Sequence, residues 1–417
     1  MQQNDQPELI DHLFRRSYAK HLAILVRLFG PSKLELLEDA LQDTFAQAVH
    51  AWREQVPERP EAWLTTAAKH RAIDLLRRQT ATQQRHQRAS ADRPLQATVE
   101  AFFLDHEVAD AQLRMIFTAC HPALKPQDQI AFALKCVSGF SGSEIAAALL
   151  LKPETVKKRL TRARAVIQHT DLQFEVPTGA ALRERLPRVL EVLYLIFNEG
   201  YHSASKDTVV RQELCSEAMR ACQLLLQSSA VDAADGAIHA LLALMCFHAS
   251  RLEAKVTSDG ELVDLKRQDR TKWHMPLAYR GHSLMSLAVQ TDSFSVYHYE
   301  AAIAAEHLRA RSFAETNWTQ IAVWYERLRV VAPSPMTDLS LAIVYIQNGN
   351  ARKSRALMEN LSPAVLASRG YLLLGCWAEW HKQFGQVEDA RACLQEALAV
   401  VVNAQERAYL LKKLAAL

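Results

Sequence analysis

Apolar residues recur at helical spacing along almost the whole chain, and runs that alternate with a period of two are nearly missing. Repeats three and four residues apart mark one face of an amphipathic helix. The pattern predicts helices over residues 9–29, 34–52, 61–79, 180–199, 209–227 and 234–251. One exception is Asp259-Gly260, which lies between short apolar pieces and predicts a turn in a small β-hairpin. The expected fold class is therefore all-α.

The second predicted helix is apolar along one half and acidic along the other. Its apolar positions follow steps of four residues: Leu37, Leu41, Phe45 and Val49. The other half carries the acidic positions Glu35, Glu38, Asp39 and Asp43. An acidic face can dock a basic partner, and it can equally be a solvated helix side, so both interpretations stand.

The third predicted helix combines a core-facing side with a row of basic donors. The apolar positions are Trp63, Leu64, Ala67, Ile73 and Leu76. The donors, which suit phosphates and base edges, are Lys69, His70, Arg71, Arg77 and Arg78. Trp52 and Trp63 flank the loop at 53–60, where they either stack on an unpaired base or belong to the core. Residues 80–93 hold hardly a bulky apolar side chain and predict a flexible polar tether.

Residues 141–166 predict a helix-turn-helix. Ser141 and Glu144 have the spacing of a capping box, and Pro153 suits the first position of the second helix. In that second helix the inward positions are Val156, Leu160, Ala163 and Ile167, and the outward ones are Thr155, Lys157, Lys158, Arg159 and Arg162. The segment carries six Lys/Arg against two Asp/Glu, although the whole chain has a net charge of only +3. We expect DNA binding here, while an ordinary surface helix is the alternative. Leu150 and Leu151 occupy the turn, where a glycine often supplies a positive φ, so we expect either another turn geometry or a strain of roughly 1 kcal/mol.

These motifs, in this order, resemble the extracytoplasmic-function sigma factors over residues 7–170. The acidic helix LEDALQDTFAQAV, the PEAWL helix with its basic end, the polar linker and the helix-turn-helix carry the likeness. The segments that start at Leu113 and Tyr194 resemble a subgroup with a long C-terminal extension of tetratricopeptide-like repeats. The resemblance implies sigma domain 2 at 1–79, a flexible linker at 80–107, sigma domain 4 at 108–172, a helical extension at 173–298 and a repeat region at 299–417.

The resemblance also assigns partners to individual residues. It implies contacts with the β′ coiled coil and β flap of core RNA polymerase, and with promoter DNA. Residues implied to bind polymerase are Glu38, Asp39, Gln42, Asp43 and Phe45. Those implied to face the −10 element are Lys69, His70, Asp74 and Arg77. Those implied to enter the major groove at the −35 element are Thr155, Lys157, Lys158, Arg159 and Arg162, and the loop at 53–60 is where a flipped base is captured.

The C-terminal half turns neutral and rich in Ala and Leu, and it shows a period. Tyr345, Gly349 and Met358 match His381, Gly385 and Leu394 at an offset of 36. A period near 34 residues with paired helices is typical of tetratricopeptide repeats, so we expect about three degenerate repeats after residue 299. Such an array binds a partner protein, contacts the sigma part of its own chain, or serves only as a scaffold. Two polar clusters are either binding sites or buried hydrogen-bond networks: Asn198, Glu199, Tyr201 and His202, and Asp269, Arg270 and Trp273.

Other features exclude several function classes. Seven cysteines show no C-x-x-C pair, which argues against a zinc ribbon or a disulfide framework, so no metal or cofactor is expected. No metalloprotease, P-loop or nucleophile-elbow spacing occurs, and an enzyme is not expected. The N-terminus lacks a signal-peptide core, and the most apolar later run, 237–247, is short for a membrane span. We therefore expect a cytoplasmic protein with no membrane contact.

Three hypotheses for function follow from the sequence. The leading one is a sigma factor that directs transcription initiation and is regulated by, or dependent on, its own extension. The second is a helix-turn-helix regulator with a tetratricopeptide sensor that does not replace a sigma subunit. The third is a repeat scaffold with a vestigial N-terminal half. Charge reversal on the acidic helix and truncation after Pro177 are the experiments that the sequence suggests.

Overall fold

The structure, a computed structural model, describes residues 6–52, 56–84, 105–149, 151–170, 172–201, 212–228, 231, 236–257, 262–291 and 294–417. Within these ranges the protein is helical and has no β-strand, which confirms the all-α prediction. Val256 and Leu262 form an isolated antiparallel bridge. The expected hairpin turn at Asp259-Gly260 lies outside the described residues.

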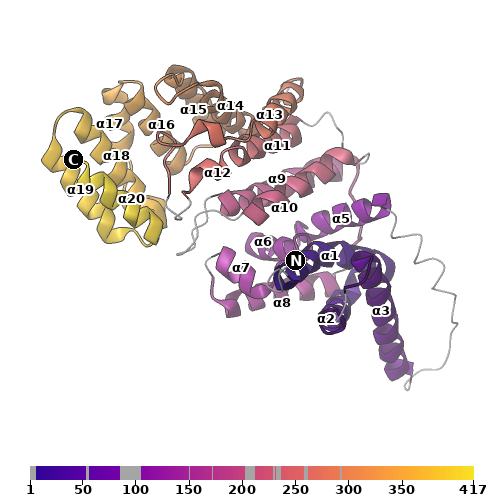
Figure 1. The fold of residues 1–417 in the computed structure, drawn as a ribbon. Coiled ribbons are helices and arrows are strands. Elements are labelled where there is room, and N and C mark those ends of the chain that lie inside the picture. Colours follow the sequence, from indigo (N-terminus) through magenta and orange to yellow (C-terminus); the bar gives the residue numbers. More distant parts are fainter. Residues whose placement is uncertain are drawn as a thin grey trace. The chain divides into compact units, whose positions relative to one another are not determined.

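The chain divides into two compact units. The first comprises residues 1–196 and 227–231, and the second comprises residues 197–226 and 232–417 (Figure 1). The first unit contains α1 (Gln6–Phe29), η1 (Pro31–Lys33), α2 (Leu34–Ala51), α3 (Pro60–Gln84), α5 (Asp105–Ala119), α6 (Pro126–Cys136), α7 (Gly142–Ala148), α8 (Pro153–His169) and most of α9 (Gly179–Tyr201). Both predicted DNA-binding modules lie in this unit. Between them, α3 reaches five residues beyond the predicted helix end at Gln79, and the rest of the expected linker as far as residue 104 lies outside the described residues.

The helices of the first unit pack around a shared apolar core. Helix α1 lies against α2, α3 and α5, and α8 lies against α6, α7, η1 and α2. In α2 the apolar residues Leu37 and Leu41 are buried, whereas Val49 is 40% exposed and Ala48 is buried near it. Steps of four residues advance 40° beyond a full turn each, so a face extrapolated from Leu37 by three such steps rotates out of the core.

In the second unit, helices that follow one another along the chain pack together, as α14 to α16 and α18 to α20 do. It contains α10 (Gln212–Gln227), α11 (Gly236–Ala249), α12 (Leu252–Lys255), η2 (Arg270–Lys272), α13 (Met275–Ala288), α14 (Val296–Arg309), α15 (Trp318–Val331), α16 (Pro335–Gln347), α17 (Ala351–Glu359), η3 (Pro363–Arg369), α18 (Gly370–Gln383), α19 (Val387–Val400) and α20 (Ala404–Ala415). Helix α11 is buried along nearly its whole length and packs against α13 and α14. It forms the apolar centre of the first part of this unit.

Two helix pairs near the C-terminus share one turn geometry. Gly349 and Gly385 both have φ of 70°, a conformation that glycine adopts without steric cost. The next amide in each turn donates to a carbonyl five residues back, from Asn350 to Tyr345 at 2.8 Å and from Gln386 to His381 at 3.0 Å. This equivalence agrees with the offset of 36 residues in the sequence. Whether the array is tetratricopeptide-like stays a prediction.

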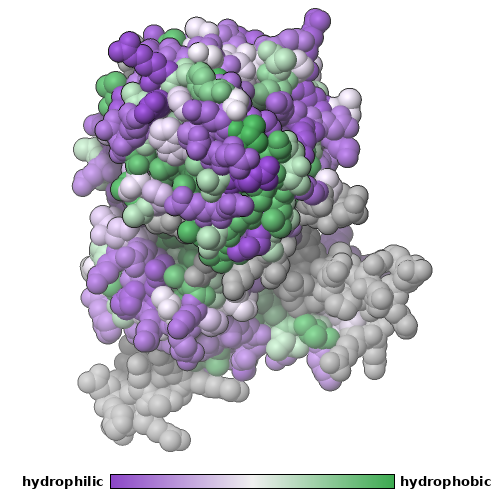
Figure 2. Space-filling model, turned by 90° about the vertical axis from the view of Figure 1, so that its left-hand side faces the viewer, coloured by the Kyte–Doolittle hydropathy of each residue, from purple (hydrophilic) through white to green (hydrophobic). Residues whose placement is uncertain are grey.

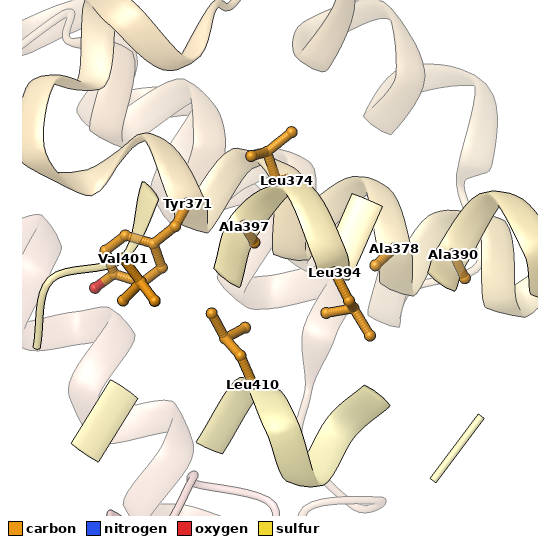
Figure 3. Close-up of a cluster of buried hydrophobic side chains, with 8 residues drawn as sticks. All are labelled: Tyr371, Leu374, Ala378, Ala390, Leu394, Ala397, Val401 and Leu410. Atoms are coloured by element: carbon orange, nitrogen blue, oxygen red, sulfur yellow. The ribbon is translucent and has the colours of Figure 1, made fainter. Parts of the chain in front are cut away.

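The last helix pair closes on α20 through a small apolar core. Tyr371, Leu374 and Ala378 of α18 face side chains of α19 and α20 (Figure 3). The facing residues are Ala390, Leu394 and Ala397 of α19, Val401 directly after it, and Leu410 of α20. Leu394 is buried, as is Met358 at the matching position 36 residues earlier, so both pairs use the same position to fill their cores.

The surface and the cysteines agree with this helical packing. On the face drawn in Figure 2, hydrophilic side chains surround separate groups of hydrophobic ones. Six cysteines are buried and Cys393 is half-buried, all as free thiols, and burial raises the pKa of Cys120 to about 12. No described helix combines the length and the apolarity that a bilayer crossing requires.

Candidate nucleic-acid interface

The helix-turn-helix forms from the cap and the apolar stripe that the sequence predicts. The Glu144 amide donates to the Ser141 hydroxyl at 3.2 Å, and the Ser141 amide donates to the Glu144 carboxylate at 2.7 Å, so the capping box is confirmed. Helix α8 begins at Pro153, and its inward positions are all buried: Val156, Leu160, Ala163 and Ile167. Leu149 closes α7 with φ of −94°, and the Leu151 amide donates to the Ala146 carbonyl. Leu149 and Lys152, on the two sides of the turn, therefore both have a negative φ, while Leu150 lies outside the described residues.

The outward face of α8 carries two kinds of basic side chain. Lys157 and Lys158 are exposed, and no hydrogen bond or ion pair joins the side chain of either to another described residue. Arg162 forms an ion pair with Asp128 at 2.7 Å, and Arg159 donates to Gln127 at the start of α6. Thr155 is half-buried. Both arginines are thus held against the neighbouring helix, whereas the two lysines point to solvent.

Helix α3 presents only part of its predicted basic row. His70, Asp74 and Arg77 are exposed, while Lys69 is 7% exposed and lies in the core side of the helix. The Arg71 guanidinium donates to Asp43 of α2 at 2.9 Å, so the two helices are joined by an ion pair. Among the described side chains of α3, His70, Asp74 and Arg77 are therefore the predicted residues that solvent reaches.

In helix α2, too, only some of the predicted polymerase-binding residues are exposed. Asp39 and Gln42 are exposed, Asp43 and Phe45 are half-buried, and Glu38 is 2% exposed. Burial first, and then the neighbouring carboxylates, raise the pKa of Asp39. Glu38 was expected on the solvent-facing acidic half, and that placement was wrong. It follows Leu34 by four residues and precedes Leu41 by three, so it falls on the apolar face.

The two tryptophans at the end of α2 and the start of α3 pack together. Trp52 is buried, and its ring meets Trp63 edge to face at 5.6 Å beside Ala48 and Leu64. Edge-to-face aromatic pairs are stabilising beyond the area that they bury. Trp52 therefore belongs to the core in this arrangement, and Trp63 is half-buried beside it. The first three residues of the following loop, 53–55, lie outside the described residues.

Helix α8 is tied to α2 by a residue that the sequence pattern did not single out. Arg164 donates to the Glu38 carboxylate at 2.6 Å, and Tyr18 of α1 donates to the same carboxylate at 3.2 Å. Burial works against the charge of Arg164, but the hydrogen bond and attraction of Glu38 outweigh it and raise the pKa of the guanidinium. The available signal was positional, because Arg164 lies four residues after Leu160, inside the apolar stripe. A charge on that stripe indicates a buried partner.

Three further arginines join the second module to its surroundings. Arg27 of α1 forms an ion pair with Asp110 of α5 at 2.9 Å and a second one with Glu107. On α9, Arg185 donates to the Phe117 carbonyl at 2.5 Å and Arg188 donates to the Gln129 side chain at 2.5 Å. The start of the C-terminal half is therefore bonded directly to α5 and α6.

Comparisons with known proteins match three segments of the chain. A sigma-70 region 2 model matches residues 13–82, a sigma-70 region 4 model matches residues 114–167, and a family of unknown function (DUF6596) matches residues 185–289. A protein of Rhizobium meliloti (strain 1021), described as uncharacterized, is 32% identical over 400 residues, which cover 93% of this chain and 91% of that protein. No solved structure matches significantly.

Proposed function

The chain belongs to the sigma-70 family as an extracytoplasmic-function-like factor with a long C-terminal extension, and from this premise we propose how it engages polymerase and promoter. Helix α8 enters the major groove of the upstream promoter element, and α3 faces the downstream element. The observation that carries the proposal is the intact capping box and buried stripe that hold α8, with Lys157 and Lys158 left in solvent. Exposed lysines close to a helix start suit phosphate contacts that position a recognition helix.

Polymerase docking is proposed for the exposed edge of α2. Asp39 and Gln42 are accessible, and acidic side chains without a buried role suit a basic polymerase surface. The predicted set also includes Glu38, Asp43 and Phe45, which are engaged inside the unit. Asp39 is therefore the residue whose charge reversal tests docking with the least disturbance of the core.

The bond between Arg164 and Glu38 leads us to propose that this structure is a closed form. Because Glu38 lies beneath Arg164, a partner that contacts the whole predicted face of α2 must first separate α8 from α2. A ligand that binds only the open arrangement shifts the population toward it. Core polymerase is the ligand proposed to do so, and promoter DNA then meets two separated modules.

The extension is proposed to support the DNA-binding module rather than to act only as an independent domain. Arg185 and Arg188 connect α9 to α5 and α6, the helices on which α7 and α8 pack. Loss of α9 would leave the Phe117 carbonyl and Gln129 without these donors. A protein partner for the repeat region, or a contact between that region and the sigma part, remains part of the proposal.

The decisive experiment is transcription by purified core polymerase from promoters near the protein's own operon. The chain is expected to bind core polymerase and to permit initiation, and Asp39→Lys is expected to abolish polymerase binding with unchanged helical content. Glu184→Lys, a charge reversal at an exposed position of α9, is the matched control and should bind normally. Duplex binding by the chain without any polymerase requirement or initiation would favour a helix-turn-helix regulator instead.

A further inference from the structure

The second unit contains a cluster of cationic and aromatic side chains that the sigma function does not use. Arg251 lies between α11 and α12, Arg270 begins η2, Trp273 follows η2, and His307 lies in the last turn of α14. Arg270 stacks on the Trp273 ring at 4.4 Å and donates to the His307 carbonyl at 2.9 Å. The His274 amide donates to the Ser250 carbonyl, which holds η2 next to Arg251.

Each of these four side chains has a buried polar atom with no hydrogen-bond partner among the described residues. The atoms are Nε of Arg251, Nη2 of Arg270, Nε1 of Trp273 and Nδ1 of His307. Arg251 is 6% exposed and Trp273 is 5% exposed, so solvent does not satisfy their N–H groups. Buried polar groups in native proteins are nearly always paired, and a concentration of exceptions needs a physical explanation.

The cluster is also short of negative charge. Among the described residues, no carboxylate lies within ion-pair distance of Arg251 or Arg270, although Arg251 does donate to His248 at 2.9 Å. Burial, followed by the charges of Arg251 and Arg270, lowers the pKa of His307 to about 3. Burial, followed by Arg251, also lowers the pKa of Lys255 nearby to about 7. Two guanidiniums thus act on their neighbours as positive charge, and the Glu315 carboxylate acts on Arg270 only from beyond ion-pair distance.

The donor set defines the chemistry of a group that would satisfy it. Guanidinium and indole N–H groups only donate, so their partner must be an acceptor. A water molecule brings no charge and accepts two hydrogen bonds, whereas an oxyanion accepts several and neutralises the arginines. A buried ionised group is stable only when it is both paired and hydrogen-bonded.

We propose that Arg251, Arg270, Trp273 and His307 form a binding site for a small oxyanion, either a phosphate group or a carboxylate. The anion joins the corner between α11 and α12 to the end of α14, so its binding stabilises the second unit. Asp269 of the same polar sequence cluster serves a different purpose, since its carboxylate accepts from the Thr271 amide and caps η2. The other predicted cluster includes Tyr201 and His202. Lys255, which is not one of its members, lies over the Tyr201 ring at 3.7 Å, and His202 lies outside the described residues.

The test is thermal unfolding of the full-length protein in a buffer free of oxyanions. Sodium phosphate and sodium acetate are added in separate titrations at constant ionic strength, with chloride as the balancing salt. A ligand that binds the folded form raises the Tm in a saturable manner. The proposal expects such a rise with phosphate or with acetate, and whichever titration saturates at the lower concentration identifies the anion class.

Three variants make the result specific. Arg251→Met removes a charge and should abolish the saturable rise in Tm without lowering the Tm in the oxyanion-free buffer, because an uncompensated buried cation is replaced by an apolar side chain. Trp273→Phe keeps an aromatic ring, removes one N–H and should weaken anion affinity about tenfold. Lys272→Met changes an exposed cation beside the site and should respond like the wild type.

Two outcomes would overturn the proposal. One is an equal Tm response in the wild type and in Trp273→Phe and Arg251→Met, which would indicate a general ionic effect. The other is a wild-type protein that shows no saturable response to either anion. If Arg251→Met does not fold, Trp273→Phe and isothermal titration of the wild type decide the question.

Discussion

Removal of the Arg164 guanidinium, by Arg164→Gln, is expected to tighten the binding of core polymerase. In the closed form the Glu38 side chain is 3% exposed, and Arg164 is its only described ion-pair partner. The substitution removes that partner, while Tyr18 still donates a hydrogen bond to the Glu38 carboxylate. Breaking a buried pair from one side costs about 3–5 kcal/mol. The Arg164 side chain is 24% exposed and the Tyr18 bond persists, so we discount the cost to about 2 kcal/mol.

If polymerase binds only the open arrangement, the free energy by which the substitution destabilises the closed form is gained in the apparent affinity for polymerase. When the closed form is favoured, a closed state weakened by about 2 kcal/mol raises the apparent affinity about thirty-fold. The assay is a titration of labelled protein with core polymerase, followed by fluorescence anisotropy. Arg164→Lys should give an intermediate affinity, and Arg183→Gln, an exposed change on α9, should match the wild type. Unchanged or weaker binding by Arg164→Gln would refute the idea that α8 covers the docking face.

The remaining predictions concern promoter binding, the N-terminal cap of α7 and the loss of stability at low pH. Lys158→Ala should weaken promoter binding and reduce the slope of log affinity against log salt by about one, as measured by filter binding, and an unchanged slope would argue against a phosphate contact. Ser141→Ala should cost about 1 kcal/mol through loss of the capping box, seen as a lower Tm, and an unaltered Tm would contradict the role of the cap. Burial lowers the pKa of His21 below its ordinary 6.5, so the unfolded chain takes up the proton first and stability falls as the pH drops below about 6.5. His21→Asn should flatten that fall in urea titrations, whereas exposed His50→Asn should leave it in place.

The sequence predicted the local structure of the DNA-binding helices well because that structure depends on neighbours in the chain. The bond between Ser141 and Glu144 and the stripe from Val156 to Ile167 are set by spacing within one or two helical turns. Such spacing can be recognised in the amino-acid sequence without a structure.

The parts that the sequence did not predict depend on contacts between distant segments. Glu38 and Arg164 are separated by 126 positions, and no periodic pattern relates them. The same holds for Arg71 and Asp43, which join α3 to α2. Charged residues that lie inside an apolar stripe carry a clue that something buried opposes them, but the partner is known only once the helices are packed.

The anchoring of α9 changes how shortened forms of this protein should be designed. A cut after Pro177, the truncation that the sequence suggests, discards Arg185 and Arg188 together with the extension. A loss of transcription in such a protein would then confuse damage to α5 and α6 with removal of a regulatory domain. A cut after Ile196 keeps both arginines in place, and only the comparison of these two cut sites separates local support from long-range control.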